Sequence, residues 1–552
     1  MTAETDENEK LIPQFPVIIF QSGSSSVLNV TWMYPSWISS FVAFGLSLIS
    51  TGLVILVIHP IILPSQGPIW MMCLFFLVTW IVATGLYFNR LFQLYLGSVV
   101  VLFVIWCHIP GFAGSIALNW CTGTACAITA ALSQHIWAHR FDKVSLASNG
   151  LGWVLRFTCM IMITWYTKYL IFGSLGSLRL LFASVPFLLQ PTSVIGFGSL
   201  DFVITLTNVV IGWWIFAGIQ TRKLLPGTLS DLSSSPTWPG KLGLIFTNPI
   251  VALLVVWCLW VITAGIVTVA HVPDTSIPVA TVYSSEFREN PVDSIVQEFR
   301  GGARFVVTSA DLFSENFCDT TTTLTCAEAI KSDVVPRIKE FGGYAIIGCA
   351  SRIIRDGKCQ RYSIAMIVHP NGEITPSLTL NKEKDDFEYA IINPSDIEGL
   401  EPDKVRFAFV SDTFGVSDFR KVVFNYAPNL IFMSGDHNAY RDQVAPQYVV
   451  DAIENRVAIV RAGASNAALV VDPIGNIVAC DEVLSDSSPA GSRNDVIQRY
   501  RTRGEVTVSY PLSGAWIRQQ IPYWIAILTY LTYLVYDIIF VIRKKRRHDR
   551  ND

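Results

Sequence analysis

The chain has 552 residues, of which 51% are hydrophobic and only 15% are charged. Soluble proteins of ordinary composition carry roughly 25% charged residues, so this deficit indicates a membrane protein. A formal net charge of −3 gives no support to nucleic acid or a strongly acidic molecule as a partner. The first ten residues are acidic and precede any long apolar run, so we expect no cleavable signal peptide.

Apolar runs long enough to cross about 30 Å of hydrocarbon recur along the chain. They predict a flexible cytoplasmic tail over 1–35, a transmembrane domain over 36–271, a last transmembrane helix over 519–543 and a basic tail over 544–552. The individual spans are expected at 37–58, 69–88, 94–114, 115–137, 150–172, 196–218, 242–270 and 521–542.

Basic residues between these runs predict the topology. Arg90, Arg140 with Lys143, Arg222 with Lys223, and the run 543–547 all fall on one side if an odd number of spans precedes residue 272. The positive-inside rule makes that side cytoplasmic. We therefore expect an integral, multi-pass protein with a cytoplasmic C-terminus and a segment 272–518 that faces the lumen or the outside.

Cysteine usage adds little to this topology. Cys318 and Cys326 flank a threonine-rich loop and could form a disulfide in an oxidising compartment. The chain has no CxxC or HExxH motif and no histidine cluster, so we expect no metal site.

Segment 272–518 has the alternating pattern of an α/β domain, because short apolar runs of strand length alternate with helical stretches. His369 to Gly372 and Asp472 to Gly475 are typical hairpin turns, with glycine where a positive φ is needed. The predicted strands are 304–307, 344–349, 363–368, 405–409, 429–433, 457–460 and 467–471. The predicted helices are 293–300, 327–340, 417–426 and 444–455.

Residues 429–479 carry a resemblance to a known family. PNLIFMSGDHNAY, Gln447 and AIENRVAIVRAGASNAALVVDPIGNIVA resemble the end of a nitrilase-superfamily (carbon–nitrogen hydrolase) domain. Such a domain between membrane helices resembles the apolipoprotein N-acyltransferases. The resemblance implies a multi-span α-helical membrane domain plus an extracytoplasmic αββα sandwich. It also implies acyl transfer from a membrane phospholipid to the amine of a lipidated protein, without a cofactor.

The family's chemistry uses a Cys thiolate as nucleophile, a Glu as general base and a Lys that stabilises the oxyanion. The Glu follows a strand, and the corresponding position here is Ala310. The Lys lies eight residues after the hairpin glycine and eight before a Glu; Gly372 and Glu388 both place Leu380 there.

The Cys belongs at a strand-to-helix elbow. Alignment on Asp412, supported by Arg420, places Val410 at the nucleophile position, whereas alignment on Phe414 selects Phe409. Ala310, Leu380 and Val410 would thus make the catalytic triad degenerate. Fallback candidates are Asp311, Lys382, Ser411, Glu388 and His437.

Three hypotheses follow. The first is a membrane pseudoenzyme that binds lipid or a lipidated protein without turning it over. The second is an active N-acyltransferase or amidase whose catalytic groups have moved to the fallback positions. The third is a transporter or assembly factor that acts through its helices, although the chain lacks the internal repeats typical of transporters.

Overall fold

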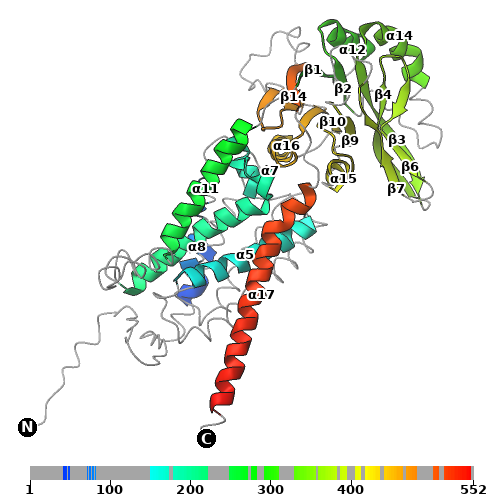
Figure 1. The fold of residues 1–552 in the computed structure, drawn as a ribbon. Helices are drawn as coiled ribbons and strands as arrows, with labels where there is room; N and C mark the ends of the chain where they lie inside the picture. The colour runs from blue at the N-terminus through cyan, green and yellow to red at the C-terminus, as the bar shows by residue number, and fades with distance from the viewer. Residues whose placement is uncertain are drawn as a thin grey trace, which may run out of the picture. The chain divides into compact units, whose positions relative to one another are not determined.

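The computed structural model describes a little over half of the chain, mainly its second half (Figure 1). The first four expected spans lie wholly or mostly outside the described residues. The described ranges are 41–46, 48–49, 71, 74–75, 77–79, 81–82, 150–172, 178–221, 248–270, 275–282, 291–309, 328–355, 358–381, 386–394, 405–411, 417–435, 441–463, 468–480, 501–508 and 515–548.

The chain forms two compact units. The helical unit lies within Met1–Leu178, Gly198–Trp260 and Ile521–Asp552. The α/β unit comprises Arg179–Phe197 and Val261–Gln520. The short piece Arg179–Phe197 falls inside the predicted transmembrane range 36–271, yet its contacts join it to the α/β unit.

The helical unit is built from α5 (Gly150–Phe172), α8 (Gly198–Thr221) and parts of α11 (Pro249–Ala270) and α17 (Ala515–His548). α5 packs on α8 through buried apolar side chains that include Phe157, Leu206 and Trp213. These helices cover four of the expected spans: 150–172, 196–218, 242–270 and 521–542.

Among the described residues, two helices are long and apolar enough to cross a membrane. Residues 198–215 of α8 are 78% buried within the protein, whereas α11 is only 11% buried. A mostly buried apolar helix also occurs in the core of soluble proteins, and α11 is the one with an exposed apolar surface. The multi-span membrane domain is therefore not confirmed and stays a prediction.

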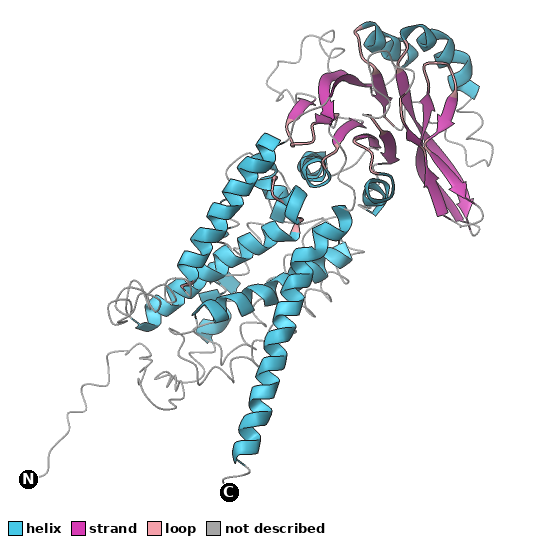
Figure 2. Ribbon diagram, viewed as in Figure 1, coloured by secondary structure: helices cyan, strands magenta, loops and turns pink. Residues whose placement is uncertain are grey.

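Two six-stranded sheets form the centre of the α/β unit (Figure 2). The first has the order β14-β1-β2-β3-β4-β5 and the second β13-β12-β11-β10-β9-β8; β6 and β7 form a separate two-stranded sheet. The bounds in the first sheet are β14 (Arg501–Val508), β1 (Thr275–Val282), β2 (Phe305–Thr308), β3 (Tyr344–Arg355), β4 (Lys358–Val368) and β5 (Ile374–Pro376). In the second they are β13 (Ile477–Cys480), β12 (Leu469–Val471), β11 (Ala458–Gly463), β10 (Leu430–Gly435), β9 (Phe407–Ser411) and β8 (Ile391–Ile392), with β6 (Leu378–Asn381) and β7 (Asp386–Tyr389) apart.

The two sheets pack face to face through an apolar core. Phe305 and Tyr344 from the first sheet meet Phe407 and Phe432 from the second. Ring centroids in this cluster lie 5.2 to 5.5 Å apart, in stacked and edge-to-face pairs, which is the geometry that aromatic quadrupoles favour. Alternate strand residues face the two sides of each sheet, so the same strands also pack against helices.

Helices cover the outer face of each sheet. α12 (Pro291–Arg300) and α14 (Val335–Ile338) pack over the first sheet, where they enclose a second apolar cluster with β1 to β4. α15 (Ser417–Tyr426) and α16 (Arg441–Asn455) lie over the second sheet (Figure 1). The layers run helix, sheet, sheet, helix, so the predicted αββα sandwich is confirmed.

The local predictions in this unit hold with shifts of a few residues. Both hairpin turns are present, with Gly372 at φ 87° and Gly475 at φ 85°. β1 and β14 were not predicted. They pair antiparallel from Thr275 with Val508 to Val282 with Arg501, so they join the first and last parts of the unit.

Candidate functional site

The candidate site lies at the carboxyl ends of the parallel strands. β1, β2 and β3 run parallel in the first sheet, and β9, β10 and β11 run parallel in the second. In α/β sheets ligands bind beyond the carboxyl ends of such strands. Ala310 comes two residues after the end of β2 and lies outside the described residues, as do Asp311, Lys382 and His437.

Val410 is the penultimate residue of β9 and its side chain is 1% exposed. Its partner on β10 is Met433, which is also buried. Phe407 and Phe409 face the core between the sheets, so alternation places Val410 on the side of α15. An isopropyl group in this place offers neither a nucleophile nor a titratable proton. Phe409, the alternative at this position, is equally inert.

The remaining predicted residues lie on strands whose side chains are not described. Leu380 on β6 pairs with Phe387 on β7, and Thr379 pairs with Glu388. The hairpin therefore brings the positions of Leu380 and Glu388 to neighbouring rungs. Ser411 ends β9 and pairs with Ser434 on β10, so the carboxyl edge of this sheet carries two serines side by side.

Two hydroxyl residues at the carboxyl ends of β1 and β2 were not predicted as site residues from the sequence. Thr281 and Ser309 are both fully buried, and within the described ranges neither side-chain oxygen has a hydrogen-bond partner. The Ser309 amide donates to the Val282 carbonyl at 3.0 Å, which fixes Ser309 beside β1. Both residues continue the alternation of the core-facing residues Val279 and Val307. They are thus two hydroxyls directed between the sheets at the strand ends.

Thr308, between these groups, has a structural role. Its hydroxyl accepts a hydrogen bond from the Gly348 amide at 2.9 Å, which ties β2 to β3. This contrast matters because an unpaired buried hydroxyl costs free energy, whereas a paired one does not. Thr281 and Ser309 are therefore the better candidates for contact with a polar ligand.

Charged groups near α16 are buried as well. Burial lowers the pKa of the Arg456 guanidinium to about 10, and the Asp472 carboxylate opposes this shift. The guanidinium is still protonated at neutral pH because that value lies well above 7. Asp472 also accepts hydrogen bonds from the Ile474 and Asn476 amides at 3.0 and 2.8 Å, so its main role is to close the β12–β13 turn.

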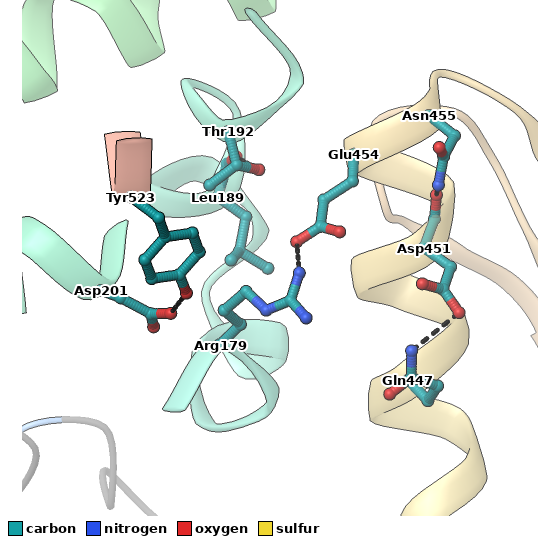
Figure 3. Close-up of polar contacts among 9 residues, drawn as sticks. All are labelled: Arg179, Leu189, Thr192, Asp201, Gln447, Asp451, Glu454, Asn455 and Tyr523. Atoms are coloured by element: carbon teal, nitrogen blue, oxygen red, sulfur yellow. Dashed lines mark hydrogen bonds and ion pairs between the residues drawn. The ribbon is translucent and has the colours of Figure 1, made fainter. Parts of the chain in front are cut away.

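An ion pair between Arg179 and Glu454 is deeply buried in the α/β unit, and each side chain is 1% exposed (Figure 3). The Arg179 guanidinium also lies over the Phe197 ring, 4.0 Å from its centroid. Nearer the start of α16, Gln447 donates to the Asp451 carboxylate at 2.8 Å, within the helix. The Arg179–Glu454 pair holds Arg179–Phe197 against α16.

In the helical unit, the Tyr523 hydroxyl of α17 donates to the Asp201 carboxylate near the start of α8, and both residues are buried (Figure 3). The Tyr523 ring stacks on Tyr166 with centroids 4.9 Å apart. Gly198 permits this approach, since a Cβ there would lie 2.8 Å from the ring. The contact joins α5, α8 and α17. Within the described ranges no cluster of three or more metal-ligating side chains occurs in either unit.

Comparison with known proteins gives neighbours only at the level of structure. No family model matches the chain, and no curated protein matches it. An amidase from Nesterenkonia sp. is 13% identical, covers 42% of this chain and 90% of its own length, and gives a TM-score of 0.29. A carbon–nitrogen hydrolase from Helicobacter pylori G27 is 13% identical. The match covers 42% of this chain and 89% of that protein, with a TM-score of 0.29. The C. elegans NitFhit protein is 12% identical. The match covers 43% of this chain and 62% of that protein, with a TM-score of 0.27.

One of these neighbours is described as an amidase and one as a carbon–nitrogen hydrolase, and none of the three is described as an apolipoprotein N-acyltransferase. At this identity and these TM-scores they transfer no activity, substrate or residue role to the chain. The fold follows from the four layers and the strand orders of the α/β unit itself.

Proposed function

We propose that this protein is a membrane-anchored, carbon–nitrogen-hydrolase-like pseudoenzyme that binds an acyl-bearing ligand, either membrane phospholipid or a lipidated protein. The observation that carries the proposal is Val410. The resemblance assigns it to the nucleophile position, and it lies near the end of β9 with a buried side chain. A strand end without a thiolate cannot form the thioester on which the family's chemistry depends.

Membrane anchoring is supported by the exposed surfaces of two helices. α11 exposes Leu254, Leu259, Ile262 and Ile266, which are 57 to 62% exposed. α17 exposes a similar apolar stripe and ends in the basic run 543–547, which suits the cytoplasmic face of a membrane and its anionic lipids. An apolar stripe of this length is stable in lipid and unfavourable in water.

The proposed orientation places the α/β unit in the lumen or outside the cell. Its support is Cys349 on β3, which forms a disulfide. Disulfides persist in oxidising compartments and are rare in the cytosol. Cys318 and Cys326, the pair suggested by the sequence, lie outside the described residues.

The test is to restore the three missing groups. Purified protein in phospholipid micelles is incubated with an alkyne-tagged acyl phospholipid, and covalent label is detected in the gel. The natural chain should retain the donor without covalent label. The triple variant Ala310→Glu, Leu380→Lys, Val410→Cys should acquire label at the new cysteine.

A matched control carries the same first two changes with Val471→Cys, which places a thiol on another fully buried strand position. It should stay unlabelled. Covalent label on the natural chain would refute the pseudoenzyme. Loss of both label and retention in every variant would refute acyl-ligand binding.

A second candidate function is an enzyme with relocated groups, and one observation favours it. Ser411 stands at the carboxyl end of β9, one residue after Val410. If Ser411 is the nucleophile, the natural chain should form an acyl ester that disappears in Ser411→Ala and persists in Ser434→Ala. Peptide mapping of the labelled protein distinguishes the two serines.

A further inference from the structure

The segment Arg179–Phe197, called the arm below, combines buried polar groups with three exposed apolar side chains. It contains a 3₁₀ helix (Leu178–Ser184), α6 (Pro186–Leu189) and α7 (Thr192–Ile195). Both short α-helices contact α16. The arm leaves α7 through Gly196, whose φ of 101° is readily adopted only by glycine, and the chain enters α8 two residues later.

Polar contacts fix one side of the arm to the α/β unit. Arg179 pairs with Glu454 on α16, and the Gln190 side-chain amide donates to the Ile474 carbonyl in the β12–β13 turn at 2.8 Å. Within the arm itself, Thr192 and Ser193 donate to the Leu189 and Gln190 carbonyls at 2.6 and 2.8 Å. All of these polar side chains are at most 3% exposed.

Three apolar side chains of the arm are nevertheless exposed: Phe187 is 42% exposed, Val194 50% and Ile195 42%. Its other described apolar residues include Leu180, Phe182, Leu189 and Phe197, which are buried. Exposed apolar side chains are favourable where the surrounding medium is lipid rather than water.

Chain connectivity points to the same medium. Ile195 lies three residues before Gly198, where a helix apolar enough to cross a membrane begins. An extended chain spans at most about 3.5 Å per residue. Ile195 therefore lies within roughly 10 Å of the start of α8, a distance similar to the depth of the headgroup layer. If α8 crosses the bilayer, Val194 and Ile195 are held at its surface.

We propose that the arm is a lipid-contacting surface: Phe187, Val194 and Ile195 insert into the interfacial layer of the membrane, while Arg179 and Gln190 hold α16 to it. This rests on the membrane anchoring in the proposed function. It does not depend on whether the strand ends bind an acyl ligand or catalyse a reaction. A second copy of the chain is the competing occupant of the same surface.

The experiment places a photocrosslinking residue at single positions of the full-length protein in phospholipid nanodiscs. Benzoylphenylalanine replaces Phe187 in one variant and Val194 in another. Ser184 serves as the matched control, because it is an exposed polar residue of the same arm. Leu259, 59% exposed on α11, reports whether the chain is anchored at all. Mass spectrometry identifies the adducts after irradiation.

We expect lipid adducts at Leu259, Phe187 and Val194, several times more abundant than at Ser184. Adducts at Leu259 without adducts at Phe187 and Val194 would overturn the proposal for the arm and leave membrane anchoring intact. Absence of lipid adducts at Leu259 and at the arm would overturn both. Adducts between protein chains at Phe187 would assign the surface to a second copy and overturn the lipid contact.

Discussion

The middle of the α/β sandwich and its margins are built on different principles. Between the sheets, Phe305, Tyr344, Phe407 and Phe432 form a continuous aromatic cluster in which every side chain packs against another. At the margins, buried polar groups are of two kinds. Arg179 and Glu454 are paired, whereas the Thr281 and Ser309 hydroxyls have no partner within the described ranges. From this difference we infer that the aromatic cluster stabilises the fold, whereas the margins are where a polar ligand can bind.

The aromatic cluster should carry the largest single contribution to stability. Phe407→Ala removes a fully buried ring from the centre of the cluster, and we expect a loss of about 4 kcal/mol in unfolding free energy. Urea titration of the purified protein measures it. Phe187→Ala, on an exposed ring, is the control and should cost little. A loss below about 1 kcal/mol for Phe407→Ala would contradict the central role of the cluster.

Removing one partner of the buried Arg179–Glu454 pair should lower the stability of the protein. Glu454→Ala removes a buried carboxylate from the Arg179 guanidinium, and we expect a loss of about 3 kcal/mol. The double variant Arg179→Met, Glu454→Leu should recover most of it, since both charges of this pair are removed together. Asp293→Ala provides the contrast. It breaks the Arg337–Asp293 pair, whose side chains are 43% and 52% exposed, and exposed pairs contribute about 0–1 kcal/mol. Equal losses from both pairs would refute the distinction.

Substitution of Gly475 in the β12–β13 turn measures how tightly this turn packs against α16. Gly475 has φ 85°, and a Cβ there would lie 2.4 Å from the Ile453 side chain on α16. Gly475→Ala should lower the unfolding free energy by about 2 kcal/mol through strain and overpacking together. Gly302 has φ 93° but open space around it, so Gly302→Ala should show the conformational strain alone, about 1 kcal/mol. Thermal unfolding of the two variants separates packing from backbone strain.

The unpaired hydroxyls should give the smallest effect on stability and the clearest effect on binding. Ser309→Ala and Thr281→Val remove buried hydroxyls that have no hydrogen-bond partner among the described residues, so the unfolding free energy should stay constant or rise by up to about 1 kcal/mol. Retention of the tagged acyl phospholipid should fall. Thr308→Val is the control, because it breaks a hydrogen bond to Gly348 and should reduce stability without a specific effect on retention. Unchanged retention in Ser309→Ala and Thr281→Val would exclude these hydroxyls from the ligand site.

The sequence predicted the interior of the sandwich well because its strands follow local rules. Apolar runs such as 344–349 and 429–433, and hairpin turns with glycine at a positive φ, depend on neighbouring residues only. β14 was missed because alternate residues are charged, with Arg501, Arg503 and Glu505 on an edge strand. Its identity as a strand comes from pairing with β1, more than two hundred residues earlier.

The candidate site was only partly predictable for the same reason. The strand that carries Val410 was predicted within two residues, because a strand is marked by its own residues, whereas the role of Val410 stays a prediction. Ser309 was passed over because its burial depends on the opposite sheet. The arm was placed in the transmembrane range, between the spans expected at 150–172 and 196–218, because Arg179 and its partner Glu454 are 275 residues apart and hydropathy carries no information on such a contact.

The arm also determines which fragment of this protein can be produced as a soluble domain. β1 and β14 bring Thr275 and Val508 together as partners, so a chain shortened to 275–508 looks like an autonomous domain with adjacent ends. Such a fragment lacks Arg179 and Gln190. It keeps Glu454 without its counter-charge and uncovers the side of α16 on which α6 and α7 rest. The excised domain should therefore be poorly soluble, and supplying residues 179–197 in trans or through a linker should restore it.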